Sequence, residues 1–270
     1  MGEPTAAQRW RAELAAWAID PAILAAAPEP PYRLPPAHFQ AEHRGAFDPG
    51  PQSSRDRALE ALPAGGAVLD VGCGAGAASL ALAPPAQRLV GVDELPDMLA
   101  AFARAALEHE VAAETVEGSW PAVAGEVGTA DVVVCHHVLY NVADAVPFVR
   151  ALTEHARRRV VVELTAAHPW VGLGPLWARA HGQPRPSGPT AELGAALVHE
   201  AGYDVQVETG RRRTRAAPWD ERVATMRRRL CLPIEREAEV AAWMREAGFT
   251  AGDPAHQDIV TLWWEPSSSA

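Results

Sequence analysis

The stretch Val68-Leu69-Asp70-Val71-Gly72-Cys73-Gly74-Ala75-Gly76 decides the fold. It begins as an apolar run interrupted by one carboxylate and continues as three glycines that alternate with small side chains. A glycine turn between a buried strand and a helix lets the backbone approach a ligand closely, and the helix N-terminus adds a positive potential. The stretch therefore predicts the first strand, turn and helix of a nucleotide-binding α/β fold.

The same alternation of strand, turn and helix repeats along the chain. Short runs rich in valine and leucine predict strands at residues 67–71, 88–93, 112–117, 131–136 and 160–164, with helices at 77–82, 96–108 and 144–157 between them. Two more strands are expected at residues 203–208 and 256–264. Such a series predicts a parallel sheet wrapped by right-handed crossovers.

Composition shifts along the chain suggest four segments. Residues 1–50 carry helical periodicity and then a proline-rich stretch, and we expect them to form a helical N-terminal cap or lid. Residues 51–165 hold the Rossmann-like core, and residues 166–265 add an insertion and the remaining helices and strands of the same domain. Residues 266–270 are expected to be a disordered tail.

A carboxylate before the glycine turn distinguishes between nucleotide cofactors. The pattern of Gly72, Gly74 and Ala77 would by itself serve NAD equally well. Asp70 precedes the first glycine by two residues, where it would repel a pyrophosphate but attract a ligand that carries an ammonium and a sulfonium. Asp70 therefore favours S-adenosylmethionine over NAD. Asp93 ends the second expected strand, where an acid can accept both ribose hydroxyls, and either nucleotide cofactor would use it.

With these residues in place, the segment from Arg55 to Leu164 resembles the class I S-adenosylmethionine-dependent methyltransferases. The residues at the family's D-x-G-x-G motif are Asp70, Gly72, Gly74 and Gly76. The resemblance places Asp93 at the ribose-binding acid and Met98 near the adenine. It implies S-adenosyl-L-methionine as the cofactor and a Rossmann-like seven-stranded sheet, mostly parallel, with an antiparallel last strand, a helical N-terminal cap and inserted lid helices.

The resemblance extends to the turn after the third expected strand. Many family members carry Gly-Asp there to bind the adenine amino group, and this chain has Gly118, Ser119 and Trp120. These three residues are therefore expected beside the adenine, with Ser119 in place of the acid. For Trp120 a core position at the start of a helix is an equal alternative.

The fourth expected strand ends in a pair of histidines, His136 and His137. Ligands of parallel sheets bind outside the carboxyl ends of the strands, so both rings should border the methyl donor. Methyl transfer is an in-line displacement that depends largely on positioning, and a general base helps when the acceptor is a hydroxyl. Either histidine could be that base. Alternatively both orient the cofactor or stabilise the loop, and His136 is also expected to be a cofactor-binding residue.

Charge and composition narrow the choice of partner. The chain has 24 basic and 34 acidic residues and a net charge of -10, which would repel a nucleic-acid backbone. Three cysteines without a CxxC pair indicate neither a disulfide framework nor a zinc site, so no metal is expected. No apolar run approaches the ~20 residues that span a bilayer. We expect a cytoplasmic, bacterial protein with a small-molecule acceptor and no nucleic-acid or membrane partner.

The sequence thus predicts a methyltransferase that acts on a small molecule, with a hydroxyl among the acceptor groups to consider. A non-catalytic S-adenosylmethionine-binding regulator or subunit is the alternative, because methyl transfer requires so small a catalytic signature. An NAD-dependent oxidoreductase is opposed by Asp70 and by the absence of lysine, and hence of a Tyr-x-x-x-Lys pair, from the chain. The acceptor atom and the oligomeric state are left open.

Overall fold

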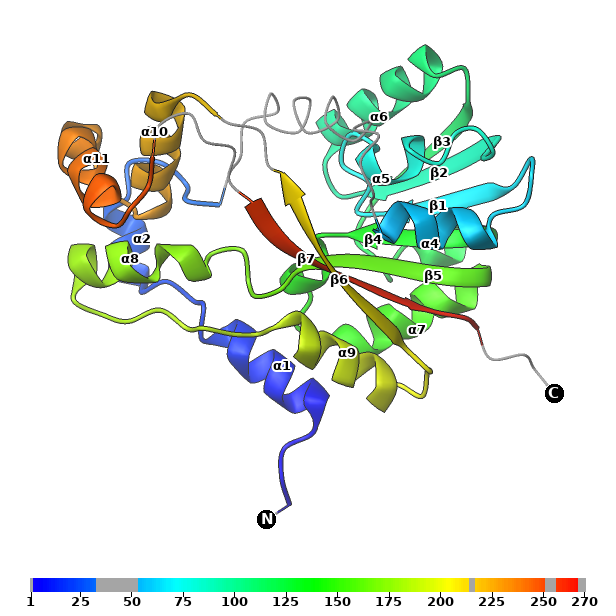
Figure 1. Cartoon of the computed structure of the whole chain (residues 1–270), viewed down its shortest axis with the longest axis horizontal. Coiled ribbons are helices and arrows are strands. Elements are labelled where there is room, and N and C mark those ends of the chain that lie inside the picture. The colour runs from blue at the N-terminus through cyan, green and yellow to red at the C-terminus, as the bar shows by residue number, and fades with distance from the viewer. Residues whose placement is uncertain (1, 33–52, 214–216, 251–255, 267–270) are drawn as a thin grey trace.

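A seven-stranded sheet forms the centre of the computed structural model, which describes residues 2–32, 53–213, 217–250 and 256–266 (Figure 1). The strands are β1 (Ala67–Val71), β2 (Arg88–Asp93), β3 (Ala112–Glu117), β4 (Ala130–His136), β5 (Ala156–Thr165), β6 (Gln206–Arg213) and β7 (His256–Trp264). They lie in the order β3-β2-β1-β4-β5-β7-β6, and β7 runs antiparallel to both of its neighbours. The Rossmann-like sheet with an antiparallel last strand is confirmed.

Burial explains the position of each strand. The central strand β1 has Val68, Leu69 and Val71 at 1% exposure or less, as expected for a parallel strand covered on both faces. The edge strand β3 is exposed along most of its length. Strand β5 begins at Ala156, earlier than the expected start at residue 160, because Arg157 pairs with Asp131 and so lies in the sheet and not on a helix.

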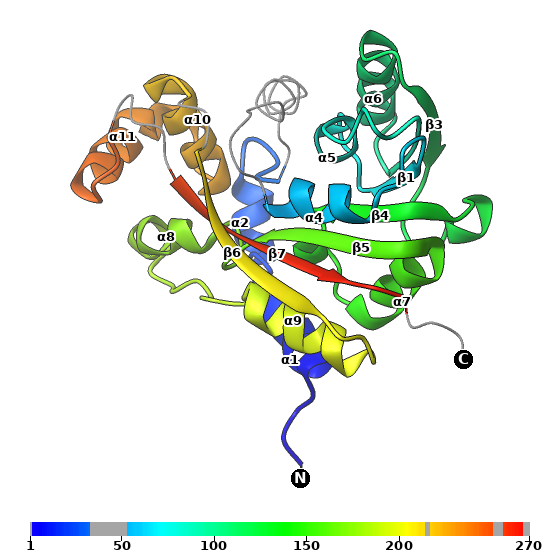
Figure 2. The same cartoon turned by 45° about the vertical axis from the view of Figure 1, so that its right-hand side comes forward.

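Helices cover both faces of the sheet (Figure 2). One face packs against α4 (Ser53–Ala61), α5 (Ala77–Leu80) and α6 (Pro96–Glu108). The other packs against α1 (Ala6–Ala15), α7 (Ala145–His155) and α9 (Ala191–Glu200). Short 3-10 helices are η1 (Ala124–Glu126), η2 (Leu139–Asn141), η3 (Val171–Leu173) and η4 (Ile234–Arg236). These two layers build separate apolar clusters, one above and one below the sheet.

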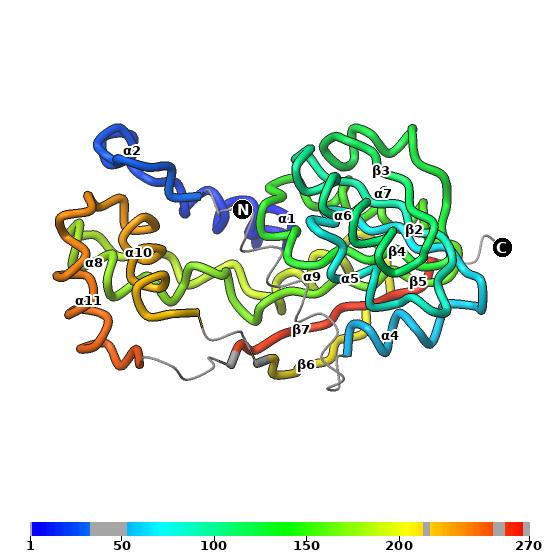
Figure 3. Tube along the Cα trace, turned by 90° about the horizontal axis from the view of Figure 1, so that it is seen from above, coloured from blue at the N-terminus to red at the C-terminus, as the bar shows by residue number. Residues whose placement is uncertain are grey.

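A third apolar cluster belongs to a group of helices at one end of the molecule (Figure 3). This helical module consists of α2 (Pro21–Ala26), α8 (Gly174–His181), α10 (Trp219–Arg229) and α11 (Glu237–Glu246). Arg227 lies within it with only 4% exposure, and its guanidinium bonds to Glu29 at 2.8 Å and Glu237 at 3.1 Å. Segments from both ends of the chain are thereby held together.

Stacked rings join the helical module to the sheet. His168 follows β5 and stacks on Trp17 with ring centroids 4.1 Å apart, while its edge meets Tyr140 at 5.5 Å. The Arg185 guanidinium lies over both Trp17, at 4.8 Å, and Trp177, at 4.5 Å. Burial lowers the pKa of His168 to about 4, so this ring packs as a neutral aromatic.

Two expectations extend beyond the described residues. Residues 33–50 of the expected N-terminal cap lie outside them, as do residues 267–270 of the expected tail. Among the helices of the described ranges, none combines the length and apolar character required to cross a membrane.

Candidate functional site

The glycine turn between β1 and α5 has a backbone that only glycine adopts easily. Gly72, Gly74 and Gly76 have φ angles of +71°, +51° and +88°. A Cβ on Gly72 would lie 2.3 Å from Val138 Cγ2, and one on Gly76 would lie 2.7 Å from Phe102 Cδ2. A Cβ on Gly74 would meet nothing within 4 Å. The turn is therefore packed at both ends and open in the middle, where a ligand could approach the backbone.

Asp93 connects this turn to the next strand and helix. One carboxylate oxygen accepts the Gly74 N–H at 2.9 Å, and the other accepts the Leu95 N–H at 3.0 Å. The acid thus lies at the carboxyl end of β2 beside the open part of the turn, which is the position expected for a ribose-binding acid.

Asp70 lies beneath the turn and has 1% exposure. Its carboxylate accepts the Ser79 hydroxyl at 2.6 Å and the Ser79 N–H at 3.3 Å, so it bonds to the first turn of α5. Burial raises the pKa of Asp70 to about 7, the Ser79 bonds oppose that rise, and the charge of Asp93 adds to it. A bound cation would favour the ionised carboxylate.

The residues expected near the adenine lie around the ends of β2 and β3. Met98 is buried at 5% exposure on α6. Gly118 has a φ of +150° and donates its N–H to the Asp93 carbonyl at 3.0 Å, and Ser119 beside it is exposed. Trp120 turns into the core, edge-on to His155 at 4.9 Å, and its buried Nε1 has no partner among the described residues.

The histidine pair ends β4 next to the glycine turn. Parallel pairing of Asp70 with Val134 aligns the carboxyl ends of β1 and β4, and Val138 then packs on Gly72. The His136 side chain is half-buried, its buried Nε2 has no partner within the described chain, and desolvation lowers its pKa to about 4. The His137 side chain is one-third exposed. His136 is thus a neutral ring with a buried Nε2, while His137 reaches the surface of the site.

A carboxylate and an arginine that the sequence analysis did not select lie against His137. Glu163 near the end of β5 has one oxygen 3.0 Å from His137 Nε2 and 3.0 Å from Arg212 Nη1. Its other oxygen accepts the Ser54 hydroxyl at 2.5 Å. A charged residue within the apolar run from Val160 to Leu164 was the available signal for Glu163.

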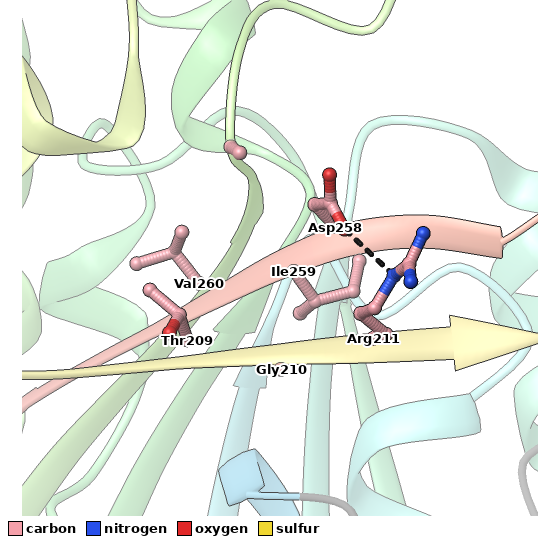
Figure 4. A pocket seen from close by; sticks show the side chains of 7 residues that line it. Thr209, Gly210, Arg211, Asp258, Ile259 and Val260 are labelled. Carbon is pink, nitrogen blue, oxygen red and sulfur yellow. Dashed lines mark ion pairs between the residues drawn. The ribbon is translucent and has the colours of Figure 1, made fainter.

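A surface hollow of about 370 Å³ lies away from these residues, against β6 and β7 (Figure 4). Its lining is Ala166, Thr209, Gly210, Arg211, Asp258, Ile259 and Val260. Arg211 and Asp258 form an ion pair across it at 3.2 Å. None of the residues selected from the sequence lines this hollow.

The chemistry of the turn fits S-adenosylmethionine. The open backbone at Gly74 leaves space for a ligand, an ionised Asp70 carboxylate would attract cationic groups such as an ammonium or a sulfonium, and Asp93 could accept ribose hydroxyls. Within the described ranges, no three histidine, cysteine or acidic side chains come together as metal ligands.

Comparison with known proteins points to the same part of the chain. A family described as "Methyltransferase domain" matches residues 68–159. No curated protein sequence matches the chain.

Among solved structures, the YcgJ protein from Bacillus subtilis is similar, with a TM-score of 0.52 and 17% identity, over 80% of this chain and 99% of that one. Magnesium protoporphyrin IX methyltransferase from Synechocystis, with bound S-adenosylhomocysteine, has a TM-score of 0.51 and 17% identity over 85% and 94%. A protein that converts a disulfide bond into a thioacetal group during echinomycin biosynthesis has a TM-score of 0.52 and 16% identity over 87% and 95%. These likenesses concern the fold.

The contact between Gly72 and Val138 can be tested by substitution. Gly72→Ala should lower the free energy of unfolding by about 3 kcal/mol, because a left-handed backbone and an overlap both add cost. Gly74→Ala, where the Cβ enters open space, should cost only about 1–2 kcal/mol. Urea unfolding measures both. Adding Val138→Ala to Gly72→Ala should recover part of the loss, and equal losses for the two glycines without recovery would contradict the close contact.

The buried Asp70 predicts a pH-dependent stability. Its folded-state pKa of about 7 exceeds its ordinary value of 3.8, so folding is favoured while the acid is protonated, and this contribution is lost as pH rises through 7. Between pH 5.5 and 8, wild type should lose roughly 2 kcal/mol relative to Asp70→Asn. Denaturant unfolding at several pH values measures the difference. Asp97→Asn, at an exposed acid, serves as the control, and parallel profiles for wild type and Asp70→Asn would refute the prediction.

Proposed function

We propose that this chain, a class I S-adenosylmethionine-dependent methyltransferase, transfers the methyl group to a small-molecule acceptor. The methyltransferase domain over residues 68–159 and the seven-stranded sheet confirm the enzyme class and the cofactor predicted from the sequence. NAD chemistry is thereby set aside. The observation that carries the proposal is the packing of Val138 on Gly72, which brings the histidine pair to the edge of the cofactor turn.

The proposed cofactor site uses the backbone of the glycine turn and the acids beside it. Gly72, Gly74 and Gly76 form the surface on which the cofactor lies, Asp93 accepts the ribose hydroxyls, and Asp70 supplies charge from below. Support comes from the Gly74 N–H bond to Asp93 and from the open space at Gly74.

The adenine end of the proposed site lies between α6 and the turn after β3. Met98, Gly118, Ser119 and Trp120 border it. The bond from Gly118 N–H to the Asp93 carbonyl supports this placement, because it holds that turn against the end of β2. The burial of Trp120 against His155 favours a supporting role for this ring over direct contact with adenine.

In this proposal His136 binds the cofactor and His137 takes the proton of the acceptor. His136 stays neutral, and its Nε2, which has no hydrogen-bond partner among the described residues, suits a bond to the cofactor. His137, with its partly exposed ring, is the general base for a hydroxyl acceptor. When bound, S-adenosylmethionine supplies an electrophilic methyl group. The acceptor oxygen takes that methyl group, the electron pair of the broken carbon–sulfur bond remains on sulfur, and the acceptor proton passes to His137.

Two aromatic residues in the segments that flank the helices of the helical module favour a small, aromatic acceptor. Tyr32 is 57% exposed and stacks on Trp170 at 5.0 Å, with the Arg229 guanidinium 5.8 Å from the Trp170 ring. Exposed aromatic surface of this kind suits apolar or aromatic ligands. The net charge of -10 further disfavours nucleic acid. Two of the similar structures are also described by small-molecule chemistry.

Three free, buried cysteines support a reducing compartment such as a bacterial cytoplasm.

Calorimetric titration with S-adenosylmethionine, S-adenosylhomocysteine and NAD tests the cofactor site. Both adenosyl compounds should bind wild type, while NAD should not. Asp93→Ala should weaken S-adenosylhomocysteine binding at least tenfold, because it removes the proposed partner of the ribose hydroxyls. Asp97→Ala, which removes an exposed acid in the first turn of α6, is the matched control. NAD binding without adenosyl binding would contradict the proposal.

Turnover tests the acceptor and the base. Methyl-labelled S-adenosylmethionine is incubated with a panel of phenols, aliphatic alcohols and amines, and labelled products are separated. On a hydroxyl acceptor, His137→Gln should lower kcat roughly 100-fold or more, since the base is removed. Unchanged rates in both His137→Gln and His136→Gln would eliminate histidine from the reaction. No turnover with any acceptor would support a regulatory role instead.

A further inference from the structure

Glu163 has more polar partners than its buried position would lead one to expect. It has 6% exposure and sits near the carboxyl end of β5, beside His136 in the sheet register. Burial raises the pKa of Glu163, but the hydrogen bond from His137 and the charge of Arg212 outweigh it and leave the pKa well below its ordinary value. Glu163 is therefore a carboxylate throughout the working pH range.

His137 Nε2 lies close to two groups that require opposite protonation states of this nitrogen. The Glu163 carboxylate, at 3.0 Å, can only accept a hydrogen bond, whereas the Arg212 Nη2, at 3.1 Å, can only donate one. A ring nitrogen carries either a proton or a lone pair. Binding Glu163 therefore requires the Nε2–H tautomer, and binding Arg212 requires the Nδ1–H tautomer.

The surroundings favour the carboxylate in this competition. Arg212 is already engaged by Glu163 through Nη1 at 3.0 Å and by Gln257 through Nη2 at 3.2 Å, and its side chain is 43% exposed. Glu163 is buried and fixed on its far side by the Ser54 hydroxyl. The Arg212 contact has hydrogen-bond geometry and the Glu163 oxygen lies at ion-pair distance, but a charge-assisted bond from Nε2–H to this fixed carboxylate is the stronger of the two alternatives.

The backbone holds the ring where this contact is made. His137 donates its N–H to the Glu163 carbonyl at 2.8 Å and has a φ of +60°, an uncommon conformation for a residue other than glycine. The same pair of residues is thus joined through main chain and side chain, which fixes the direction of the imidazole.

We propose that Glu163 is a positioning residue that selects the Nε2–H tautomer of His137, leaving the Nδ1 lone pair free to accept the proton of a hydroxyl acceptor. The inference rests on the proposed role of His137 as the base. The acceptor proton moves to Nδ1, giving an imidazolium whose Nε2–H remains bonded to Glu163, and water later takes the proton. When the charge of Glu163 is removed, Arg212 favours the Nδ1–H tautomer instead, because its guanidinium donates a hydrogen bond to Nε2.

Nitrogen-15 NMR of the free protein tests the tautomer without any acceptor. In protein labelled at the histidine ring nitrogens, the His137 signals are assigned by their loss in His137→Gln, and their shifts at pH 8.5 distinguish Nε2–H from Nδ1–H. Wild type should show Nε2–H. In Glu163→Gln, which keeps the size of the side chain but removes its charge, the ratio of Nε2–H to Nδ1–H should fall about tenfold, because Arg212 then competes for the nitrogen.

Matched variants separate this effect from a general disturbance. Glu208→Gln removes a carboxylate that pairs with Arg57 at 3.0 Å, and it should leave the His137 tautomer as in wild type. Arg212→Gln should retain the Nε2–H tautomer of His137, because the Glu163 carboxylate is still present. This variant tests the inference even if Glu163→Gln does not fold. An Nδ1–H tautomer in wild type or in Arg212→Gln, or a tautomer ratio unaffected by Glu163→Gln, would overturn the inference.

An activity measurement keeps this inference apart from the proposed function. Glu163→Gln should lower kcat on a hydroxyl acceptor about tenfold, Glu163→Asp should recover part of the loss, and the affinity for S-adenosylhomocysteine should stay within twofold of wild type. A large loss in His137→Gln with none in Glu163→Gln would refute the role of Glu163 but leave the base in place. No loss in His137→Gln would refute the base itself.

Discussion

The site depends on the close approach of Val138 to Gly72, where a Cβ would lie only 2.3 Å from the valine methyl group. This contact joins two segments that are distant in sequence, the turn after β1 and the loop after β4. Since each segment carries a different part of the chemistry, their separation determines whether a methyl donor on the turn can meet a base on the loop. A larger side chain at position 72 would have to displace Val138, which directly follows His137 in the chain. Proximity of this kind can account for much of a methyl-transfer rate.

Charge beneath the turn imposes a second constraint. Asp70 is buried, and Asp93 nearby raises its pKa further. A buried carboxylate destabilises a protein at the pH where it ionises, so a folding argument alone gives no reason for an acid there. A bound cationic ligand would offset the free-energy cost of ionising Asp70, because it favours the carboxylate form. The proposed cofactor site would account for the position of Asp70, and the Ser79 bonds to its carboxylate oppose the rise in its pKa.

Local patterns predicted the parts of the fold that depend on local burial. The strands at residues 67–71 and 88–93 were predicted to the residue, because apolar runs end there at glycine or acid. The predicted end of α7 was two residues too late. A basic residue such as Arg157 is typical of a helix C-terminus, and only the structure shows that it pairs with Asp131 on β4. The histidine pair could be found from the strand that it ends. Its partners could not, because Glu163 and Arg212 are 49 residues apart and meet only through the sheet order β5-β7-β6.

That sheet order also explains why a polar cluster is kept at the end of β5. A carboxylate paired with a guanidinium contributes little net stability, because removing both groups from water costs about as much free energy as their attraction returns. Apolar residues of similar size would often stabilise the fold equally well. Unlike apolar residues, a polar pair can determine which nitrogen of a neighbouring imidazole carries the proton. Because β7 is antiparallel and inserts between β5 and β6, Arg212 lies two strands away from Glu163, where it pairs in register with Gln257 of β7 and donates to its side chain at 3.2 Å. The antiparallel strand thereby contributes to the site as well as to the fold, since it sets the distance from which Arg212 reaches His137.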